Sequence, residues 1–245
     1  MSVRPDWLNR YLAGERAQVW HELRQLGDRM RAPGLAEEAQ AVCDEMAHRA
    51  RRNIEMIIGR LDEQGYRFHE NNDDQTPTEP FAPPGPEAET HLRWLEERLG
   101  PLPMTLSSWV RIVGDVWLVG THPQWRNSAD ADPLVFEVEG TRHPAGGIRE
   151  YAKEEIEYWQ EDEQPGPFVL PVAPDHLHKA NVSGGGPYGI LLPDGCADAH
   201  FVGEVGMPLV DYLTWVFHNG GFPRPTNDNA QWDVLFQLRQ ELQPL

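Results

Sequence analysis

The chain has 245 residues, 40% of them apolar, and a formal net charge of −18, which suits one large domain or a domain with an appendage. The charge is uneven, because residues 1–70 hold 11 basic and 12 acidic residues, whereas residues 71–245 hold 10 basic and 27 acidic ones. Such an acidic field disfavours nucleic acid and anionic lipid and favours a basic partner, although it also promotes solubility without any partner.

Helical periodicity marks the first part of the chain. A run of apolar side chains begins at Trp7 and continues at three- and four-residue steps until Pro33-Gly34 interrupts it. A second, longer stripe covers residues 35–61 and ends before Gly65. Residues 1–70 are therefore predicted to form an N-terminal helical hairpin, two helices that pack on each other and on the rest of the chain.

A polar, proline-containing segment follows at residues 71–87. Its five prolines replace the periodic pattern and predict an extended connector with polyproline character. Phe81 is expected to pin this connector to the surface of the domain. Use of the segment as a proline-rich ligand for another domain is an alternative.

The main domain, residues 88–245, is predicted to begin with two helices. The first ends at Gly100, and after the turn Pro101-Leu-Pro103 a short second helix buries Trp109 and ends at Gly114. Apolar runs rich in β-branched residues then predict five strands, at residues 116–119, 134–138, 168–172, 188–192 and 201–205.

Three further helices are predicted around these strands. One covers residues 148–159, one begins at Pro208 and ends at Gly220-Gly221, and the last follows a cap at Asn227-Asp-Asn229. Consecutive strands joined by turns imply an antiparallel meander, because a parallel α/β sheet needs regular alternation of strands and helices. The predicted fold class is therefore α+β: an N-terminal helical hairpin followed by a mainly antiparallel β-sheet packed with helices.

The stretch Leu99-Gly-Pro-Leu-Pro103, followed by a helix with Trp109, by Gly114 and by apolar strands, resembles the opening of the SUKH superfamily. That superfamily is named for a yeast cell-wall-assembly regulator and is widespread among bacterial immunity proteins. The resemblance covers about residues 88–220, and the preceding hairpin and an acidic insertion at residues 148–163 depart from it. It implies a SUKH-like α+β domain that binds another protein, often to neutralise a toxin enzyme, without chemistry of its own.

An acidic block occupies the insertion. Four of its glutamates recur at three- and four-residue steps, so they share one face of the predicted helix. Like charges at this spacing destabilise an isolated helix by about a few tenths of a kcal/mol per pair, which points to a role in binding a basic surface, with a solvated helix face as the alternative. Two aspartates of the loop before the second strand are expected to extend the patch. The candidate partner-binding residues are Glu150, Glu154, Glu157, Glu161, Asp130 and Asp132.

His176-Leu-His178 beside Asp175 is a second candidate site. If this segment formed a strand, both imidazoles would project to the same face and could ligate a metal. A matching third ligand is absent from the local sequence, although His122, His143 and His200 remain candidates to converge after folding. The alternative function is therefore a metal-dependent hydrolase that uses His176 and His178.

Other signals of chemistry are absent from the sequence. It contains no Gly-x-Ser-x-Gly elbow, and the glycine run at residues 184–186 precedes a predicted strand, whereas a phosphate-binding loop precedes a helix. Cys43 and Cys196 predict no disulfide framework, and the sequence shows neither a signal peptide nor an apolar run long enough to span a membrane. We therefore expect a cytoplasmic protein without catalytic residues or a cofactor.

Three hypotheses follow from these patterns. The first is a non-enzymatic module that binds a protein partner, for example a basic toxin, through its acidic surface. The second is the metal-dependent hydrolase. The third is a structural module in which the hairpin of residues 6–64 mediates self-association.

Overall fold

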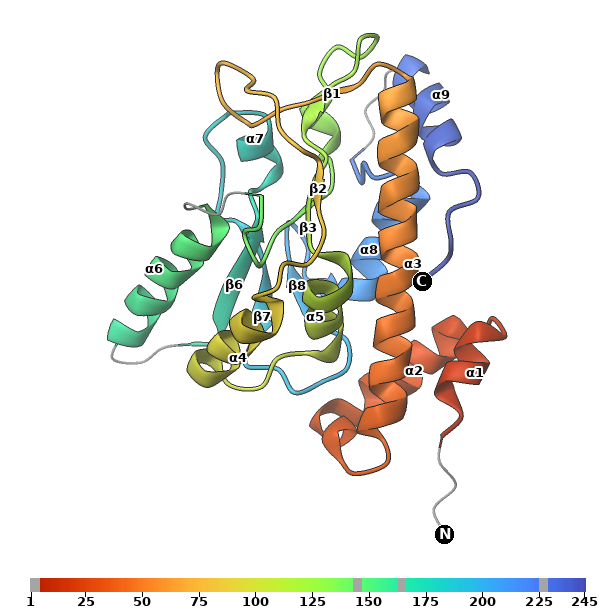
Figure 1. The fold of residues 1–245 in the computed structure, drawn as a ribbon, viewed down its shortest axis with the longest axis vertical. Coiled ribbons are helices and arrows are strands. Elements are labelled where there is room, and N and C mark those ends of the chain that lie inside the picture. The colour runs from red at the N-terminus through yellow and green to blue at the C-terminus, as the bar shows by residue number, and fades with distance from the viewer. Residues whose placement is uncertain (1–4, 143–146, 163–165, 225–228) are drawn as a thin grey trace.

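The computed structural model describes residues 5–142, 147–162, 166–224 and 229–245. Within these ranges, helices and antiparallel sheets form an α+β fold, which confirms the predicted class. The long helix α3 (Ala36–Glu63) runs along the molecule, with the strands on one side of it and α9 (Asn229–Leu238) on the other (Figure 1). Among the described residues, no helix combines the length and the apolar character needed to cross a membrane.

The first arm of the N-terminal hairpin differs from the prediction. It consists of two separate helices, α1 (Trp7–Leu12) and α2 (Arg16–Leu26), because the chain reverses at Gly14, whose φ of +105° lies outside the right-handed helical range. The 3₁₀ turn η1 (Gly27–Arg31) then leads from α2 towards α3. The prediction of one continuous first helix is therefore wrong, whereas the apolar stripe of α3 is buried as predicted.

Helix α3 organises the core. Helix α1, helix α5 (Met104–Ser108) and the π-helical turn η2 (Trp109–Val113) all pack on it, and α9 adds a further contact. Trp109 is fully buried, its ring centroid lies 4.6 Å from that of Phe136, and its Nε1 donates to the carbonyl oxygen of Gly114 at 2.9 Å. The helix that was predicted to carry Trp109 therefore lies at the junction of the N-terminal helices and the sheet.

Two short sheets cover this junction. Strand β1 (Arg67–Phe68) pairs antiparallel with β4 (Gly120–Thr121). Strand β3 (Asp115–Trp117) lies between β2 (Phe81–Ala82) and β5 (Val135–Phe136), and both pairs are antiparallel. Part of the segment predicted to be an extended connector thus forms a strand at the edge of a sheet.

The close approach of β2 to the end of η2 requires a glycine. Gly114 has a φ of +92°, and a Cβ atom there would lie 2.3 Å from the carbonyl oxygen of Ala82. Only glycine accommodates both conditions. Phe81 of β2 is half-buried against the core, and the guanidinium of Arg51 lies 5.5 Å from the centroid of its ring, so Phe81 anchors the segment as predicted.

A four-stranded antiparallel sheet completes the fold. Its strands follow the order β6 (Phe168–Ala173), β7 (Tyr188–Leu192), β8 (His200–Val202) and β9 (Met207–Pro208). The order of the first three confirms the predicted meander, and β9 was not predicted. Helix α8 (Leu209–His218) starts directly after β9. The predicted strand at residues 201–205 is shorter in the structure. The predicted cap before α9 lies mostly outside the described residues.

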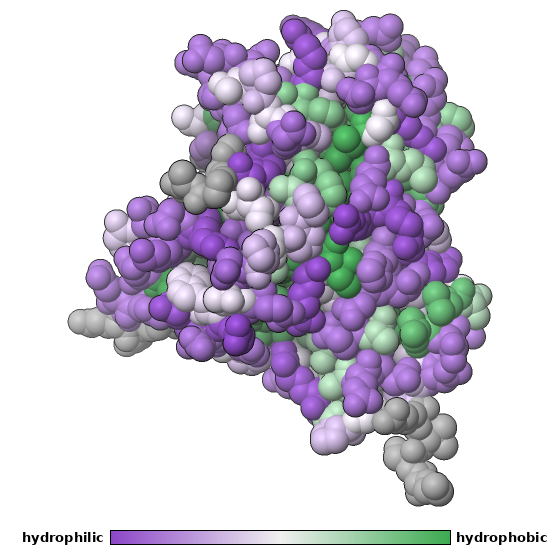
Figure 2. All heavy atoms as spheres, viewed as in Figure 1, coloured by the Kyte–Doolittle hydropathy of each residue, from purple (hydrophilic) through white to green (hydrophobic). Residues whose placement is uncertain are grey.

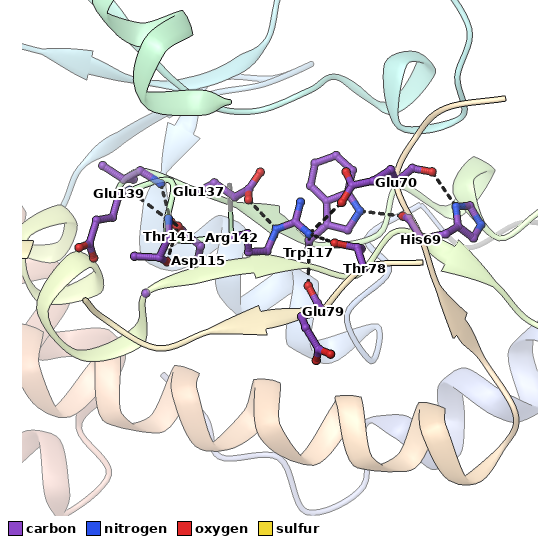
Figure 3. Close-up of polar contacts among 12 residues, drawn as sticks. His69, Glu70, Thr78, Glu79, Asp115, Trp117, Glu137, Glu139, Thr141 and Arg142 are labelled. Carbon is purple, nitrogen blue, oxygen red and sulfur yellow. Dashed lines mark hydrogen bonds and ion pairs between the residues drawn. The ribbon is translucent and has the colours of Figure 1, made fainter. Parts of the chain in front are cut away.

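A buried polar network ties the segment before β2 to the sheet (Figure 3). The guanidinium of Arg142 donates to the carboxylate of Glu137 at 2.7 Å, to that of Glu70 at 3.2 Å and to the hydroxyl of Thr78 at 2.6 Å. It also lies 4.6 Å from the centroid of a ring of Trp117. Because the Arg142 side chain is only 2% exposed, these contacts replace the water that its charge would otherwise bind.

Asp115 holds the loop after β5 in the same way (Figure 3). Its carboxylate is buried and accepts hydrogen bonds from the backbone N–H groups of Val138, Glu139 and Thr141, at 2.9, 3.2 and 2.6 Å, and from the hydroxyl of Thr141 at 2.8 Å. Glu139, also buried, accepts a hydrogen bond from the N–H of Gly85 at 3.1 Å. The buried carboxylates of Asp115 and Glu139 thus hold this loop in place.

His91 links helix α4 (Ala88–Leu99) to this loop and predicts a pH dependence of stability. Its Nε2 lies 2.9 Å from the carbonyl oxygen of Val138, and burial, together with the charge of Arg149, lowers the pKa of His91 to about 4. The unfolded chain binds a proton near pH 6.5, so stability is complete above that pH and is lost as the pH falls towards 4. Between pH 7.5 and 5, His91 should contribute a loss of about 2 kcal/mol in the free energy of unfolding.

Chemical unfolding at both pH values measures this loss. The variant His91→Gln keeps a donor for Val138 and removes the titrating group, so its stability should fall by about 2 kcal/mol less than that of the wild type. Equal losses in the two proteins would show that His91 is not responsible.

Candidate protein-binding surface

Helix α6 (Ile148–Glu161) is anchored to the fold by one narrow stripe. Ala152 and Ile156 are buried, and α6 packs on β6. At the end of the helix, the ring of Trp159 lies 5.6 Å from that of Phe168, and its Nε1 donates to the carbonyl oxygen of Gly166 at 2.8 Å. The helix predicted at residues 148–159 is confirmed, and most of its circumference faces away from the core.

The four glutamates predicted to share a face all lie on this outward side and are exposed. The Nζ of Lys153 lies 3.9 Å from a carboxylate oxygen of Glu150, and both side chains are more than half exposed. Within the described ranges, no Arg, Lys or His side chain lies at ion-pair distance from Glu154, Glu157 or Glu161. The negative charge of this side therefore remains available to a binding partner.

Two tyrosines accompany the glutamates. Tyr151 is 40% exposed and Tyr158 is 70% exposed. Residues seven apart in a helix lie on nearly the same line, so Tyr151 and Tyr158 flank Glu154 on the outward side. Tyrosine is enriched at the energetic centres of protein interfaces, because it combines a large apolar ring with a hydrogen-bonding hydroxyl. We call this surface the α6 face; it consists of Glu150, Tyr151, Glu154, Glu157, Tyr158 and Glu161.

The α6 face occupies an outer edge of the molecule. In Figure 1, α6 lies at the opposite side of the sheet region from α3 and α9. Figure 2 shows the same edge as mainly hydrophilic. A partner can therefore approach α6 without displacing another element of the described fold.

The two aspartates that were predicted to extend the patch lie in and directly after the 3₁₀ turn η3 (Ala129–Ala131). Asp130 is exposed in η3 and accepts a hydrogen bond from the side chain of Asn127 at 2.7 Å. This turn packs on α7 (His176–Lys179). Asp132 is only 4% exposed, so its prediction as a surface contact is wrong.

Asp132 instead forms a buried ion pair. Its carboxylate lies 2.6 Å from the Nζ of Lys179, whose side chain is fully buried, and accepts a hydrogen bond from the hydroxyl of Tyr188 at 3.2 Å. Asp132 reaches this position with a φ of +56°, in the left-handed region that aspartate tolerates better than most residues. Lys179 also lies 5.0 Å from the centroid of the Tyr188 ring. The pair holds η3, α7 and β7 together.

The structure also separates His176 and His178. They lie in α7, not in a strand, and a helix rotates residues two apart by about 200°, so the two rings point away from each other. The Nδ1 of His176 lies 2.9 Å from a carboxylate oxygen of Glu204, and the Nδ1 of His178 lies 2.5 Å from one of Asp175. The prediction that both imidazoles share a face is therefore wrong, and it was the basis of the proposed metal site.

A different group of potential metal ligands does converge within the described part of the chain. Ligand atoms of Asp28, Asp194 and Cys196 lie within 4.8 Å of one another. Burial and the neighbouring carboxylates raise the pKa of the Cys196 thiol to about 12, so it keeps its proton at neutral pH. A metal would have to displace this proton, because the thiolate is the form of cysteine that ligates. His143, one of the other histidine candidates, lies outside the described residues.

The tyrosines are the part of the α6 face that sequence reasoning missed. Aromatic residues in an amphipathic helix are normally assigned to the core, and Tyr151 and Tyr158 stand next to the buried positions 152 and 156. Their seven-residue spacing, on the same side as Glu154, was the available signal.

Comparison of the chain with protein-family models, with curated proteins and with solved structures finds no match. The SUKH resemblance and the functions that it implies therefore stay predictions.

Proposed function

We propose that this chain is a protein-binding module without an enzymatic activity, and that the α6 face binds a basic surface of its partner. The carrying observation is a set of exposed glutamates, three of which have no cation at ion-pair distance within the described residues, around the exposed ring of Tyr158. Acidic side chains steer a basic partner towards this edge, and the tyrosine rings then supply apolar contact area.

The partner is proposed to be a basic protein, and the SUKH resemblance makes a toxin enzyme the preferred class. In that case binding itself is the function, because a toxin is neutralised when its active surface is covered. The proposed compartment is the cytoplasm. Both cysteines are free, which is compatible with a reducing environment.

A triple charge reversal tests the proposal. The variant Glu154→Lys, Glu157→Lys, Glu161→Lys replaces exposed residues with another good helix former, so the fold should remain intact. Affinity capture from the native organism, followed by identification of the bound proteins, should recover a basic partner with the wild type and at least about tenfold less of it with the variant, because like charges then face each other.

A matched control separates local from general electrostatics. Reversal of Glu63, Asp74 and Glu97 to lysine changes the net charge by the same amount at exposed positions outside α6. This variant should capture the partner nearly as well as the wild type. Undiminished capture by the α6 variant, or an equal loss with the control, would exclude the α6 face as the binding surface.

A further inference from the structure

A groove of about 330 Å³ lies between α4 and the beginning of α6. It is lined by Glu87 directly before α4, by Thr90, His91 and Trp94 of α4, and by Arg149, Glu150 and Lys153 of α6. Its volume lies at the lower end of the range of about 300–1,000 Å³ that is typical of small-molecule sites. The groove adjoins the α6 face and shares Glu150 with it, but its other lining residues are not part of that face.

Arg149 is the residue that gives the groove its chemistry. Its Nε is shielded from solvent and has no hydrogen-bond partner among the described residues. Its charge is nevertheless close enough to lower the pKa of His91 and to act on the buried carboxylate of Glu139. The guanidinium of Arg149 forms no hydrogen bond or ion pair among the described residues, so those of its N–H groups that line the groove can donate to a carboxylate or phosphate, which accepts two of them at once.

The neighbours of Arg149 add a second cation and an uncharged acceptor. Lys153 is half exposed and shares only a 3.9 Å contact with Glu150, so its ammonium can turn to a ligand. His91 uses Nε2 for the carbonyl oxygen of Val138, which assigns the proton to Nε2 and leaves Nδ1 as an acceptor. The groove thus pairs donors for an anionic group with an acceptor for a hydroxyl or amide.

The ring of Trp94 forms the aromatic part of the groove. It stacks on His91, with ring centroids 5.7 Å apart and an angle of 14° between the rings, and the guanidinium of Arg98 lies 4.5 Å from its centroid. Because these contacts hold the indole in place, it presents a fixed apolar edge to a ligand. The volume exceeds what a lone carboxylate or phosphate fills, which leaves space for an organic body.

We propose that the groove between α4 and α6 binds a small organic anion, whose carboxylate or phosphate group is held by Arg149 and Lys153 and whose organic body lies along Trp94. Glu87 and Glu150 at the rim exclude polyanions and favour a ligand with a single anionic group.

Calorimetric titration with three probes that share one ring tests this site. Sodium benzoate, phenyl phosphate and neutral benzyl alcohol are titrated at equal ionic strength into the full chain. At least one anion should bind saturably at one site per chain, and benzyl alcohol should not. The preferred anion then identifies the head group as carboxylate or phosphate. No saturable binding of either anion, or equal binding of benzyl alcohol, would overturn the proposal.

Variants locate the binding. Arg149→Gln should weaken the bound anion at least about tenfold, because a charge-assisted hydrogen bond is lost. Arg93→Gln removes an exposed cation of α4 that does not line the groove and should leave the affinity within about twofold. If Arg149→Gln alters folding, Lys153→Gln at an exposed position provides an independent test, and it should weaken binding by several-fold. Wild-type affinity in both groove variants would contradict the site.

Discussion

The variant Lys179→Met is expected to lose about 3–5 kcal/mol of unfolding free energy relative to the wild type. Lys179 is fully buried and its Nζ lies 2.6 Å from the carboxylate of Asp132. Methionine fills a similar volume, so the loss comes from the charge and not from a cavity. Asp132 would then keep a buried carboxylate whose remaining partner is the hydroxyl of Tyr188. Urea unfolding at neutral pH measures the difference.

The double variant Lys179→Met with Asp132→Asn is the control for this prediction. Asparagine tolerates the left-handed backbone of position 132, where φ is +56°, and can still accept a hydrogen bond from Tyr188. Because no unpaired charge remains, the double variant should recover most of the lost stability. A loss below about 1 kcal/mol in the single variant, or an equal loss in both, would show that the ion pair is not what stabilises this region.

The variant Arg142→Met is expected to lose a similar amount, about 3–5 kcal/mol at pH 8. Removal of the guanidinium leaves the carboxylates of Glu137 and Glu70 near each other without the charge that both contact. It also removes the contact over Trp117 and the hydrogen bond to Thr78, which hold the segment before β2 (Figure 3). The loss should appear both in urea unfolding and as faster proteolysis within residues 70–80.

The pH dependence of this variant identifies the cause. Burial raises the pKa of Glu137 to about 7 even though Arg142 acts to lower it, so loss of Arg142 raises this pKa further. A carboxyl with a raised pKa contributes stability that is complete below the unfolded value, near 4.5, and is lost as the pH rises through the folded value. The difference between Arg142→Met and the wild type should therefore shrink from pH 8 to pH 5. A difference that is independent of pH would contradict this role of Glu137.

The sequence predicted the elements that depend on local pattern. Strand β7 has the predicted bounds, and α6 and α8 lie where the spacing of Ile156 and the position of Pro208 placed them. In each case the apolar residues that pack the element against the core lie close together in the sequence, so their spacing predicts the element directly. The antiparallel order of β6 to β8 followed from the short connections between strands, whereas β9 was not predicted.

The buried charges were not predictable in this way. Asp132 and Lys179 are 47 positions apart, and Arg142 meets Glu70 across 72. In the sequence each looks like an ordinary surface residue, because a charged side chain is buried only when a distant partner compensates it. The prediction of Asp132 as part of an exposed patch failed for this reason.

The histidine segment failed for a local reason that the sequence did contain. Asp175 caps α7, and its side chain accepts a hydrogen bond from the backbone N–H of His178 at 2.9 Å. Aspartate directly before His176-Leu-His178 is a helix N-terminal signal, and it argued against the strand that a shared metal would need. The break at Gly14 in the first arm of the hairpin is a similar case, because glycine favours a chain reversal there.

The salt dependence of partner affinity tests the α6 face most directly. With the captured partner purified, the dissociation constant is measured for the wild type, for the triple α6 variant and for the control variant, at about 50 mM and about 500 mM salt. The wild type and the control should both bind tightly at low salt and weaken together as salt rises, whereas the α6 variant should bind at least about tenfold more weakly at low salt and depend less on salt. An α6 variant that binds as tightly as the wild type at low salt, with the same salt dependence, would contradict the proposed function.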